Sequence, residues 1–175
     1  MSKQDSDEAR AHKKLGLKFV ILMWLLLIAL LYFLFNDVLE KDYNPNQQVS
    51  SQQINNINTV VLQRNRYGHY VTQGKINNEK VTLLLDTGAT DISIPYNIAK
   101  KLNLTFGAEQ RYQTANGIIV GNLTTLNSVS IGNIELKNVR ASINPKMDRD
   151  EILLGMSFLK DIEFTQRGNT LILRQ

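Results

Sequence analysis

Hydrophobic and polar positions divide the chain into an uninterrupted apolar run, a polar segment and a longer region of short alternating patterns. The apolar run extends from Phe19 to Phe35 and contains no charged residue. With the few residues before it, it can form a helix of roughly 30 Å, which matches the hydrocarbon core of a bilayer. We therefore expect residues 19–35 to form a transmembrane helix. A cleaved signal peptide is the competing interpretation, but its apolar region is usually shorter, and no small-residue cleavage site follows Phe35.

Charged residues flank the apolar run unevenly. The residues before it include five cations, whereas only Lys41 follows closely, among three acidic residues. Because cationic flanks remain on the cytoplasmic side of a membrane, we expect residues 1–18 to be a cytoplasmic segment of a single-pass protein. The rest of the chain is then periplasmic or extracellular, and the helix lies in the inner, cytoplasmic membrane. The five cations are Lys3, Arg10, Lys13, Lys14 and Lys18.

The polar segment follows the apolar run and is rich in Asn, Gln and Ser. These residues dominate from Asn44 to Asn58, which offers few apolar anchors for a core. Such a composition is typical of a flexible tether. We therefore expect a flexible linker over residues 36–58 and a folded domain over residues 59–175.

The region 59–175 carries short β-prone runs separated by turn signals, which is typical of an all-β domain. Gly68–Ile76 and Lys80–Asp86 are expected to form a hairpin. Asn116-Gly117 marks another, because Asn-Gly is the strongest short hairpin signal. Pro95 is expected to open a short helix, since proline is tolerated in a first turn. The pattern predicts about eight or nine strands and one or two short helices, arranged in a closed or nearly closed β-barrel.

The composition excludes several kinds of chemistry. The chain has no cysteine and only two histidines, His12 and His69, so zinc lacks a plausible ligand set. It has neither the spacing of an EF-hand loop nor a Gly-x-Ser-x-Gly turn for a serine nucleophile. Charges in the domain are mildly basic and scattered, which is typical of a solvated surface. We expect no metal, no cofactor and no nucleic-acid partner.

Asp86 is the distinctive ionisable residue, because it directly follows three leucines. We expect Leu83–Leu85 to form a strand buried on both sides, which Asp86 ends. Gly88 permits a tight turn and, with Ala89, leaves the approach to the carboxylate open. Thr87 offers a hydroxyl that can hydrogen-bond to a neighbouring chain. Such a loop presents a carboxylate at the bottom of a cleft, although a plain polar turn is the alternative interpretation of this tetrapeptide alone.

Three segments together carry a resemblance to a known family. Asp86–Ala89, DTGA after apolar residues, resembles the active-site signature of aspartic proteases. Ile152–Leu159, ILLGMSFL, is similar to the second apolar segment of that family with its glycine and short helix, and Thr114–Gly117, TANG, lies where the family places its flap hairpin. With one signature in one lobe, the chain resembles the retropepsins, and among them the membrane-anchored bacterial members. The resemblance implies a single-lobe acid-protease fold, a closed β-barrel with one or two short helices.

The resemblance also implies an activity, that of an aspartic endopeptidase acting on polypeptides without a cofactor. In the family, two aspartates share a proton and activate a water molecule. One lobe supplies one aspartate, so Asp86 needs the same residue of a second copy, in a homodimer with two-fold symmetry. The implied site comprises catalytic Asp86, the loop residues Thr87, Gly88 and Ala89, and the flap residues Ala115, Asn116 and Gly117.

Neighbouring residues raise an alternative and mark a departure from the family. Asp91 is close to Asp86 in sequence, but the tight turn between them should aim its side chain elsewhere, which argues against an intramolecular pair. Retroviral members carry an aspartate where this chain has Thr90 and an arginine where it has Met156. Their bracing of the dimer is therefore not expected here. The rival hypothesis is a catalytically weak or inactive peptide-binding or scaffold module on the same fold.

Overall fold

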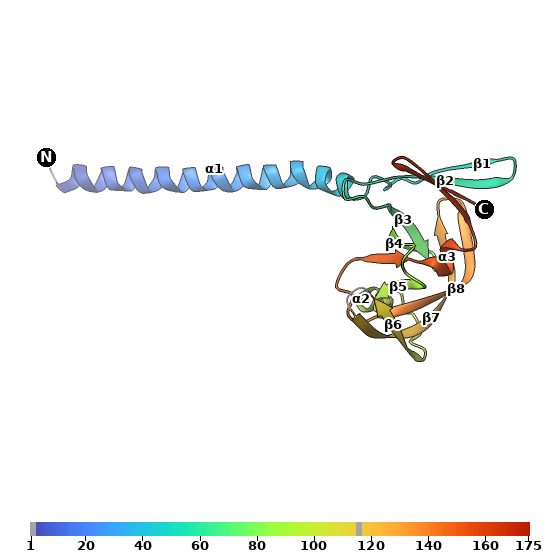
Figure 1. The fold of residues 1–175 in the computed structure, drawn as a ribbon. Coiled ribbons are helices and arrows are strands. Elements are labelled where there is room, and N and C mark those ends of the chain that lie inside the picture. The colour runs from blue at the N-terminus through green and yellow to red at the C-terminus, as the bar shows by residue number, and fades with distance from the viewer. Residues whose placement is uncertain (1–2, 115–116) are drawn as a thin grey trace. The chain divides into compact units, whose positions relative to one another are not determined.

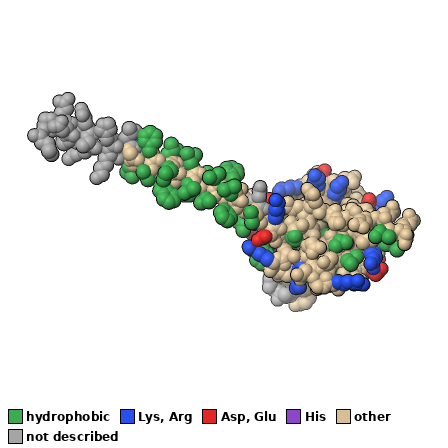
Figure 2. All heavy atoms as spheres, turned by 90° about the horizontal axis from the view of Figure 1, so that it is seen from above, with side chains coloured by type: hydrophobic (Ala, Val, Ile, Leu, Met, Phe, Trp, Pro, Cys, Tyr) green, Lys and Arg blue, Asp and Glu red, His purple; other side chains and the backbone are tan. Residues whose placement is uncertain are grey.

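The computed structural model describes residues 3–114 and 117–175 (Figure 1). The chain forms two compact units, one ending at Glu40 and one running from Lys41 to Gln175. The first unit consists of helix α1, Lys3–Tyr43, which continues into the start of the second. Within α1, Gly16–Tyr43 contains an 18-residue stretch with a mean hydropathy of 2.6 and is long and apolar enough to cross a membrane. Figure 2 shows its hydrophobic side chains exposed along the helix. A membrane span and a signal sequence share these properties.

In its described residues, the second unit contains eleven strands and two short helices, as expected for an all-β domain. The elements are β1 Ser50–Ile54, β2 Ile57–Gln63, β3 Val71–Ile76, β4 Glu79–Leu85, β5 Ile92–Pro95, α2 Tyr96–Lys101, β6 Glu109–Thr114, β7 Gly117–Ile131, β8 Ile134–Asn144, β9 Glu151–Leu154, α3 Met156–Leu159, β10 Glu163–Arg167 and β11 Thr170–Arg174. Helix α2 begins directly after Pro95, whose φ of −57° suits the position before a helix.

The strands form two sheets. The smaller sheet has four antiparallel strands in the order β1-β2-β11-β10. The larger has seven strands in the order β3-β4-β9-β5-β8-β7-β6, and an additional pairing of β3 with β7 joins its strands into a ring. This ring is consistent with the expected closed or nearly closed β-barrel, and β6 lies outside it as an edge strand next to β7.

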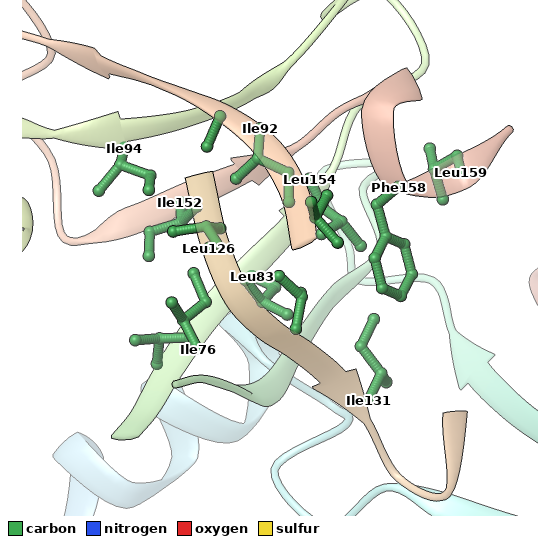
Figure 3. Close-up of a cluster of buried hydrophobic side chains, with 14 of the residues drawn as sticks. Ile76, Leu83, Ile92, Ile94, Leu126, Ile131, Ile152, Leu154, Phe158 and Leu159 are labelled. Atoms are coloured by element: carbon green, nitrogen blue, oxygen red, sulfur yellow. The ribbon is translucent and has the colours of Figure 1, made fainter. Parts of the chain in front are cut away.

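The core of the domain is one cluster of buried hydrophobic side chains, contributed by both sheets and by α2 and α3; Figure 3 shows part of it. Buried positions alternate with half-buried ones along β9 and β11, because successive side chains of a strand point to opposite faces. Helix α3 adds Phe158 and Leu159 to this buried cluster, and the helix lies against β5, β8 and β9. The largest enclosed side chains include Ile76, Leu83, Ile92, Ile94, Leu126, Ile131, Ile152, Leu154 and Phe158. This core fixes the positions of β4, β5 and β9, which carry the candidate site.

The structure differs from the expected flexible linker over residues 36–58. Strand β1 and the start of β2 lie there, paired with each other around a turn at Asn55 and Asn56, which both have positive φ. Asn46 is buried, and its side-chain amide donates to the backbone oxygens of Gln63 at 2.9 Å and Val71 at 2.7 Å. Its side-chain oxygen accepts from Gln63 N at 2.7 Å. The Asn46 side chain thus hydrogen-bonds to backbone groups at the ends of two strands. The segment is therefore attached to the domain despite its polar composition.

Candidate active site

Asp86 lies directly after β4, a central strand of the larger sheet. Its backbone N–H donates to the oxygen of Leu154, at the end of the adjacent parallel strand β9, at 3.1 Å. The preceding leucines differ from the expectation of a strand buried on both sides. Leu83 is fully buried, whereas Leu84 and Leu85 are half-buried, because one face at this end of β4 is only partly covered within one chain.

The loop after Asp86 orients its carboxylate. Gly88 N–H donates to Oδ1 of Asp86 at 2.9 Å, and Ala89 N–H donates to the backbone oxygen of Asp86 at 3.2 Å. A backbone N–H bonded to a carboxylate oxygen fixes the rotation of the side chain. Thr87 and Gly88 are exposed, so this edge of the loop faces solvent in the single chain.

The loop is attached to the segment that opens helix α3. Met156 N–H donates to the oxygen of Ala89 at 2.8 Å, and Ser157 N–H donates to the oxygen of Thr90 at 2.9 Å. These bonds require a close approach at Gly155, where a Cβ would lie 2.6 Å from the oxygen of Ala89. The segments that contain Thr90 and Met156, the two departures from the retroviral pattern, are thus joined by backbone hydrogen bonds.

A cleft of about 390 Å³ opens beside the Asp86 carboxylate. Its lining combines the loop with side chains from the hairpin of β6 and β7 and from the ring strands β5, β8 and β9. The lining residues are Asp86, Gly88, Ala89, Thr90, Asp91, Ser93, Tyr112, Gln113, Thr114, Ile119, Ser142, Asn144 and Leu153. Most of them carry hydrogen-bonding groups, and the two carboxylates are the only formal charges among them. The cleft suits a polar, extended ligand.

Asp91 lines the same cleft, but its carboxylate has other partners. Its Oδ2 accepts from the Tyr112 hydroxyl at 3.2 Å and from Nε of Arg140 at 3.2 Å. Burial, and secondarily the charge of Asp91, raises the pKa of the Tyr112 phenol. The same carboxylate raises the pKa of Arg140. In the described residues no hydrogen bond joins Asp91 to Asp86, in line with the argument against an intramolecular pair.

Comparison with known proteins places this arrangement in a family. The family described as gag-polyprotein putative aspartyl protease matches residues 72–161, which is half of the chain and includes the Asp86 loop and α3. The crystal structure of a retropepsin-like aspartic protease from Rickettsia conorii is 34% identical and superposes with a TM-score of 0.58. The match covers 73% of this chain and 95% of that one. The chain belongs to the retropepsin-like aspartic proteases.

Two curated relatives of this retropepsin-like chain are described as uncharacterized. One, from the cobV 5′ region of Sinorhizobium sp, is 37% identical over 112 residues, which are 61% of this chain and 47% of the relative. The other, from Rickettsia prowazekii (strain Madrid E), is 34% identical over 107 residues, or 59% of this chain and 46% of the relative. The chain therefore spans about half the length of the curated relatives it matches.

The residues expected to form a flap fall in the hairpin of β6 and β7. These strands pair in antiparallel register from Glu109 with Asn122 to Thr114 with Gly117. Gly117 has a φ of +102°, which a glycine adopts without strain, and its oxygen accepts from the Thr114 hydroxyl at 2.7 Å. Of the expected flap residues, Gly117 is placed at the start of β7, whereas Ala115 and Asn116 lie outside the described residues.

Two residues beside the retropepsin-like loop were not singled out from the sequence. Tyr112 shares a strand with Thr114, two positions on, so alternation in β6 gives a signal that it faces the same side. Arg140 lies 49 positions after Asp91, and no local pattern connects them. For metals, the described part of the chain contains no group of three or more His, Cys, Asp or Glu side chains that could hold an ion.

Proposed function

We propose that this retropepsin-like chain is a membrane-anchored aspartic endopeptidase. One observation carries the proposal: the Asp86 carboxylate, oriented by the Gly88 N–H at 2.9 Å, borders a cleft that the β6–β7 hairpin lines from the other side. Family membership supports the same reaction class. A carboxylate presented to a cleft of this kind acts as an acid or base on a bound polypeptide.

The second carboxylate of the reaction comes from a second copy of the chain. The sequence holds one Asp-Thr-Gly, and Asp91 is occupied by Tyr112 and Arg140. A two-fold axis beside the exposed Thr87 and Gly88 brings Asp86 of each chain together. The half-buried Leu84 and Leu85 leave apolar surface near that axis, which a second chain covers.

The paired carboxylates share one proton, because two negative charges a few ångströms apart cannot both remain ionised. The ionised carboxylate takes a proton from a water molecule, whose oxygen forms a bond to the peptide carbonyl carbon. The protonated carboxylate donates to the carbonyl oxygen as the tetrahedral intermediate forms. Transfer of a proton to the amide nitrogen then accompanies cleavage of the C–N bond. The two aspartates behave as one titrating unit.

The substrate in this proposal is an extended polypeptide that lies as a strand between the loop and the flap. The loop is Asp86 with Thr87, Gly88 and Ala89, and the flap includes Ala115, Asn116 and Gly117 from the hairpin turn. Polar groups lining the cleft pair with the backbone of the substrate. Neither a metal nor a cofactor takes part.

The proposed location is the inner membrane, with residues 19–35 as a single span. The cationic segment 1–18 then remains in the cytoplasm, and the protease domain is periplasmic or extracellular. The apolar helix supports the anchor by its length and composition. Labelling with a membrane-impermeant reagent of a cysteine introduced at Gln48, which is exposed, tests this orientation, since the natural chain has no cysteine. A cysteine that reacts only after lysis contradicts it.

The catalytic role of Asp86 is tested by cleavage of an unstructured protein at mildly acidic to neutral pH. Asp86→Asn keeps the shape of the side chain and removes its acid–base chemistry, so we expect a loss of kcat of at least about a hundredfold. Asp148→Asn is the matched control, because Asp148 is exposed and outside the cleft. Equal cleavage by the wild-type and Asp86→Asn proteins contradicts the proposal.

The shared site is tested by mixing wild-type and Asp86→Asn chains in equal amounts and allowing them to exchange. If each site needs Asp86 from both chains, random pairing leaves roughly one quarter of the dimers intact. Activity then falls below the half that independent chains would retain. An activity of one half shows that a single chain is sufficient.

The rival function is a peptide-binding module without turnover. Its signature is a wild-type protein that binds an extended peptide in the cleft and leaves it intact, with the same affinity in the Asp86→Asn variant. The acidic side chain beside the cleft favours the enzyme, because binding alone does not need a carboxylate at this position.

A further inference from the structure

Strand β6 forms one side of the candidate cleft and is weakly supported by the sheet. It is the last strand of the seven-stranded sheet, and within the described chain its backbone pairs only with β7. Its alternate side chains Gln110, Tyr112 and Thr114 are half-buried, whereas the intervening ones are exposed. An edge strand of this kind depends on side-chain contacts for its position relative to the rest of the domain.

Those contacts come from one polar cluster. The Tyr112 hydroxyl donates to Oδ2 of Asp91 at 3.2 Å, and Nε of Arg140 donates to the same oxygen at 3.2 Å. The terminal nitrogen of the Arg140 guanidinium donates to Oε1 of Gln110 at 3.0 Å. Arg140, on β8, therefore connects Asp91 with Gln110 of β6. Asp91 also accepts a hydrogen bond from Tyr112 of the same strand.

The burial of Asp91 makes these contacts mutually dependent. Its side chain is 5% exposed, whereas that of Arg140 is 54% exposed. A buried carboxylate is costly without a charged partner and hydrogen bonds. The planar fork of an arginine reaches two acceptors at once, which a lysine does not do. Removing one member therefore weakens the hold of the others on β6.

We propose that Asp91, Arg140 and Tyr112 form a clamp that fixes strand β6 over the cleft, with Tyr112 as a positioning residue for the substrate. The clamp joins β6 to the segment that carries Asp86, because Asp91 directly follows the loop that α3 braces. Tyr112 lies opposite Ile119 in the hairpin, and both line the cleft. The clamp thus sets the distance between the candidate catalytic carboxylate and the strand that covers the substrate. This inference rests on the proposed function.

The first test is hydrogen exchange of the full chain in detergent, which needs no activity. Tyr112→Phe removes only the hydroxyl, so the domain is expected to fold. We expect the amides of β6 to exchange several-fold faster than in the wild-type protein, with the amides of β10 and β11 unchanged. Tyr96→Phe is the matched control, because Tyr96 packs on Phe106 outside the cleft. Unchanged exchange in β6 overturns the clamp, whether or not the protein proves to be a protease.

The second test separates a positioning role from a general loss of structure. For peptide cleavage we expect Tyr112→Phe to raise KM about tenfold, the effect of losing a hydrogen bond to a charged group, while kcat stays within about twofold. Arg140→Lys keeps the charge but loses the fork and should raise KM similarly. A fall in kcat with KM unchanged overturns the positioning role. If the wild-type protein does not cleave, the proposed function fails, and the exchange result alone decides on the clamp.

Discussion

Two carboxylates of the cleft differ in their surroundings, and this difference assigns them different roles. Asp86 is half-buried and is held by one backbone N–H, so much of its carboxylate remains available to a ligand or a second chain. Asp91 is buried, and its Oδ2 accepts hydrogen bonds from Tyr112 and Arg140. A group that must gain and lose protons needs access, whereas a group that fixes a strand needs permanent partners. The first suits catalysis and the second suits positioning.

The contacts of Tyr112 in the clamp should make the free energy of unfolding depend on pH in the alkaline range. Burial and the charge of Asp91 raise the pKa of Tyr112 in the folded protein, so the folded state holds the phenolic proton more tightly than the unfolded state. This contribution to stability is complete below the unfolded-state pKa of about 10 and is lost as pH rises through the folded-state value. We expect the free energy of unfolding to fall more steeply over this alkaline range in the wild-type protein than in Tyr112→Phe. Parallel curves for the two proteins contradict the assignment.

Adding a methyl group at Gly155 or at Gly88 should have different consequences, because the first position is closely packed and the second borders the Asp86 carboxylate. A Cβ at Gly155 collides with the backbone oxygens of Ala89 and Asp91, so we expect Gly155→Ala to destabilise the domain by roughly 3 kcal/mol or more. A Cβ at Gly88 meets only Oδ1 of Asp86, at 3.2 Å. We therefore expect Gly88→Ala to fold but to cleave peptides more slowly. Thermal unfolding and peptide cleavage measured on both variants check the two expectations, and a fully stable Gly155→Ala protein contradicts the first.

At the scale of elements, the segment before β1 is attached to the domain by hydrogen bonds of polar side chains. Asn46 bonds to Gln63 and Val71, and Asn65 donates to the oxygen of Tyr43 at 2.9 Å. The Tyr43 hydroxyl donates to Glu151 at 2.6 Å, at the start of β9. The segment is thereby attached to β2, β3 and β9, the last of which lies beside the strand that carries Asp86.

Asn46→Ala tests this attachment. It leaves two backbone oxygens and one N–H without their partner, and buried unsatisfied groups cost about 1–3 kcal/mol each. Because water reaches part of the site after truncation, we expect the free energy of unfolding to fall by roughly 3 kcal/mol in a denaturant titration. Gln48→Ala, at an exposed position two residues on, should change it by less than about 0.5 kcal/mol. Equal stabilities of the two variants would show that the segment is loose.

The sequence predicted the elements around the site better than their long-range contacts. Alternation and turn residues predicted β3, β4 and the short helix after Pro95, because strand period and turn chemistry are local properties. Composition predicts a linker where the structure has β1, because Asn, Gln and Ser are common in tethers, and no sequence signal identified its partner β2 as a strand. The contacts of Asp91 with Arg140 and of Asn46 with Val71 join residues far apart in sequence, so only the folded chain shows them.

For the whole molecule, the proposed dimer connects activity with concentration. Chains held in one membrane meet more often than chains in solution, because the anchor raises their effective concentration. We expect the specific activity of residues 41–175, which form a compact unit, to fall on dilution as dimers dissociate. The full chain reconstituted in vesicles should keep its specific activity when the vesicles are diluted. A specific activity of the detached unit that is independent of concentration contradicts a dimer that dissociates in this range.

The attachment of Tyr43 also limits how far the enzyme can range. With residues 19–35 in the bilayer, as proposed, and Tyr43 bonded to Asn65 and Glu151, only residues 36–42 connect the span to the attached part of the domain. Even fully extended, these residues reach roughly 25 Å at about 3.5 Å per residue. In the proposed arrangement the protease domain therefore stays close to the bilayer, which brings the exposed segments of other membrane proteins within its reach.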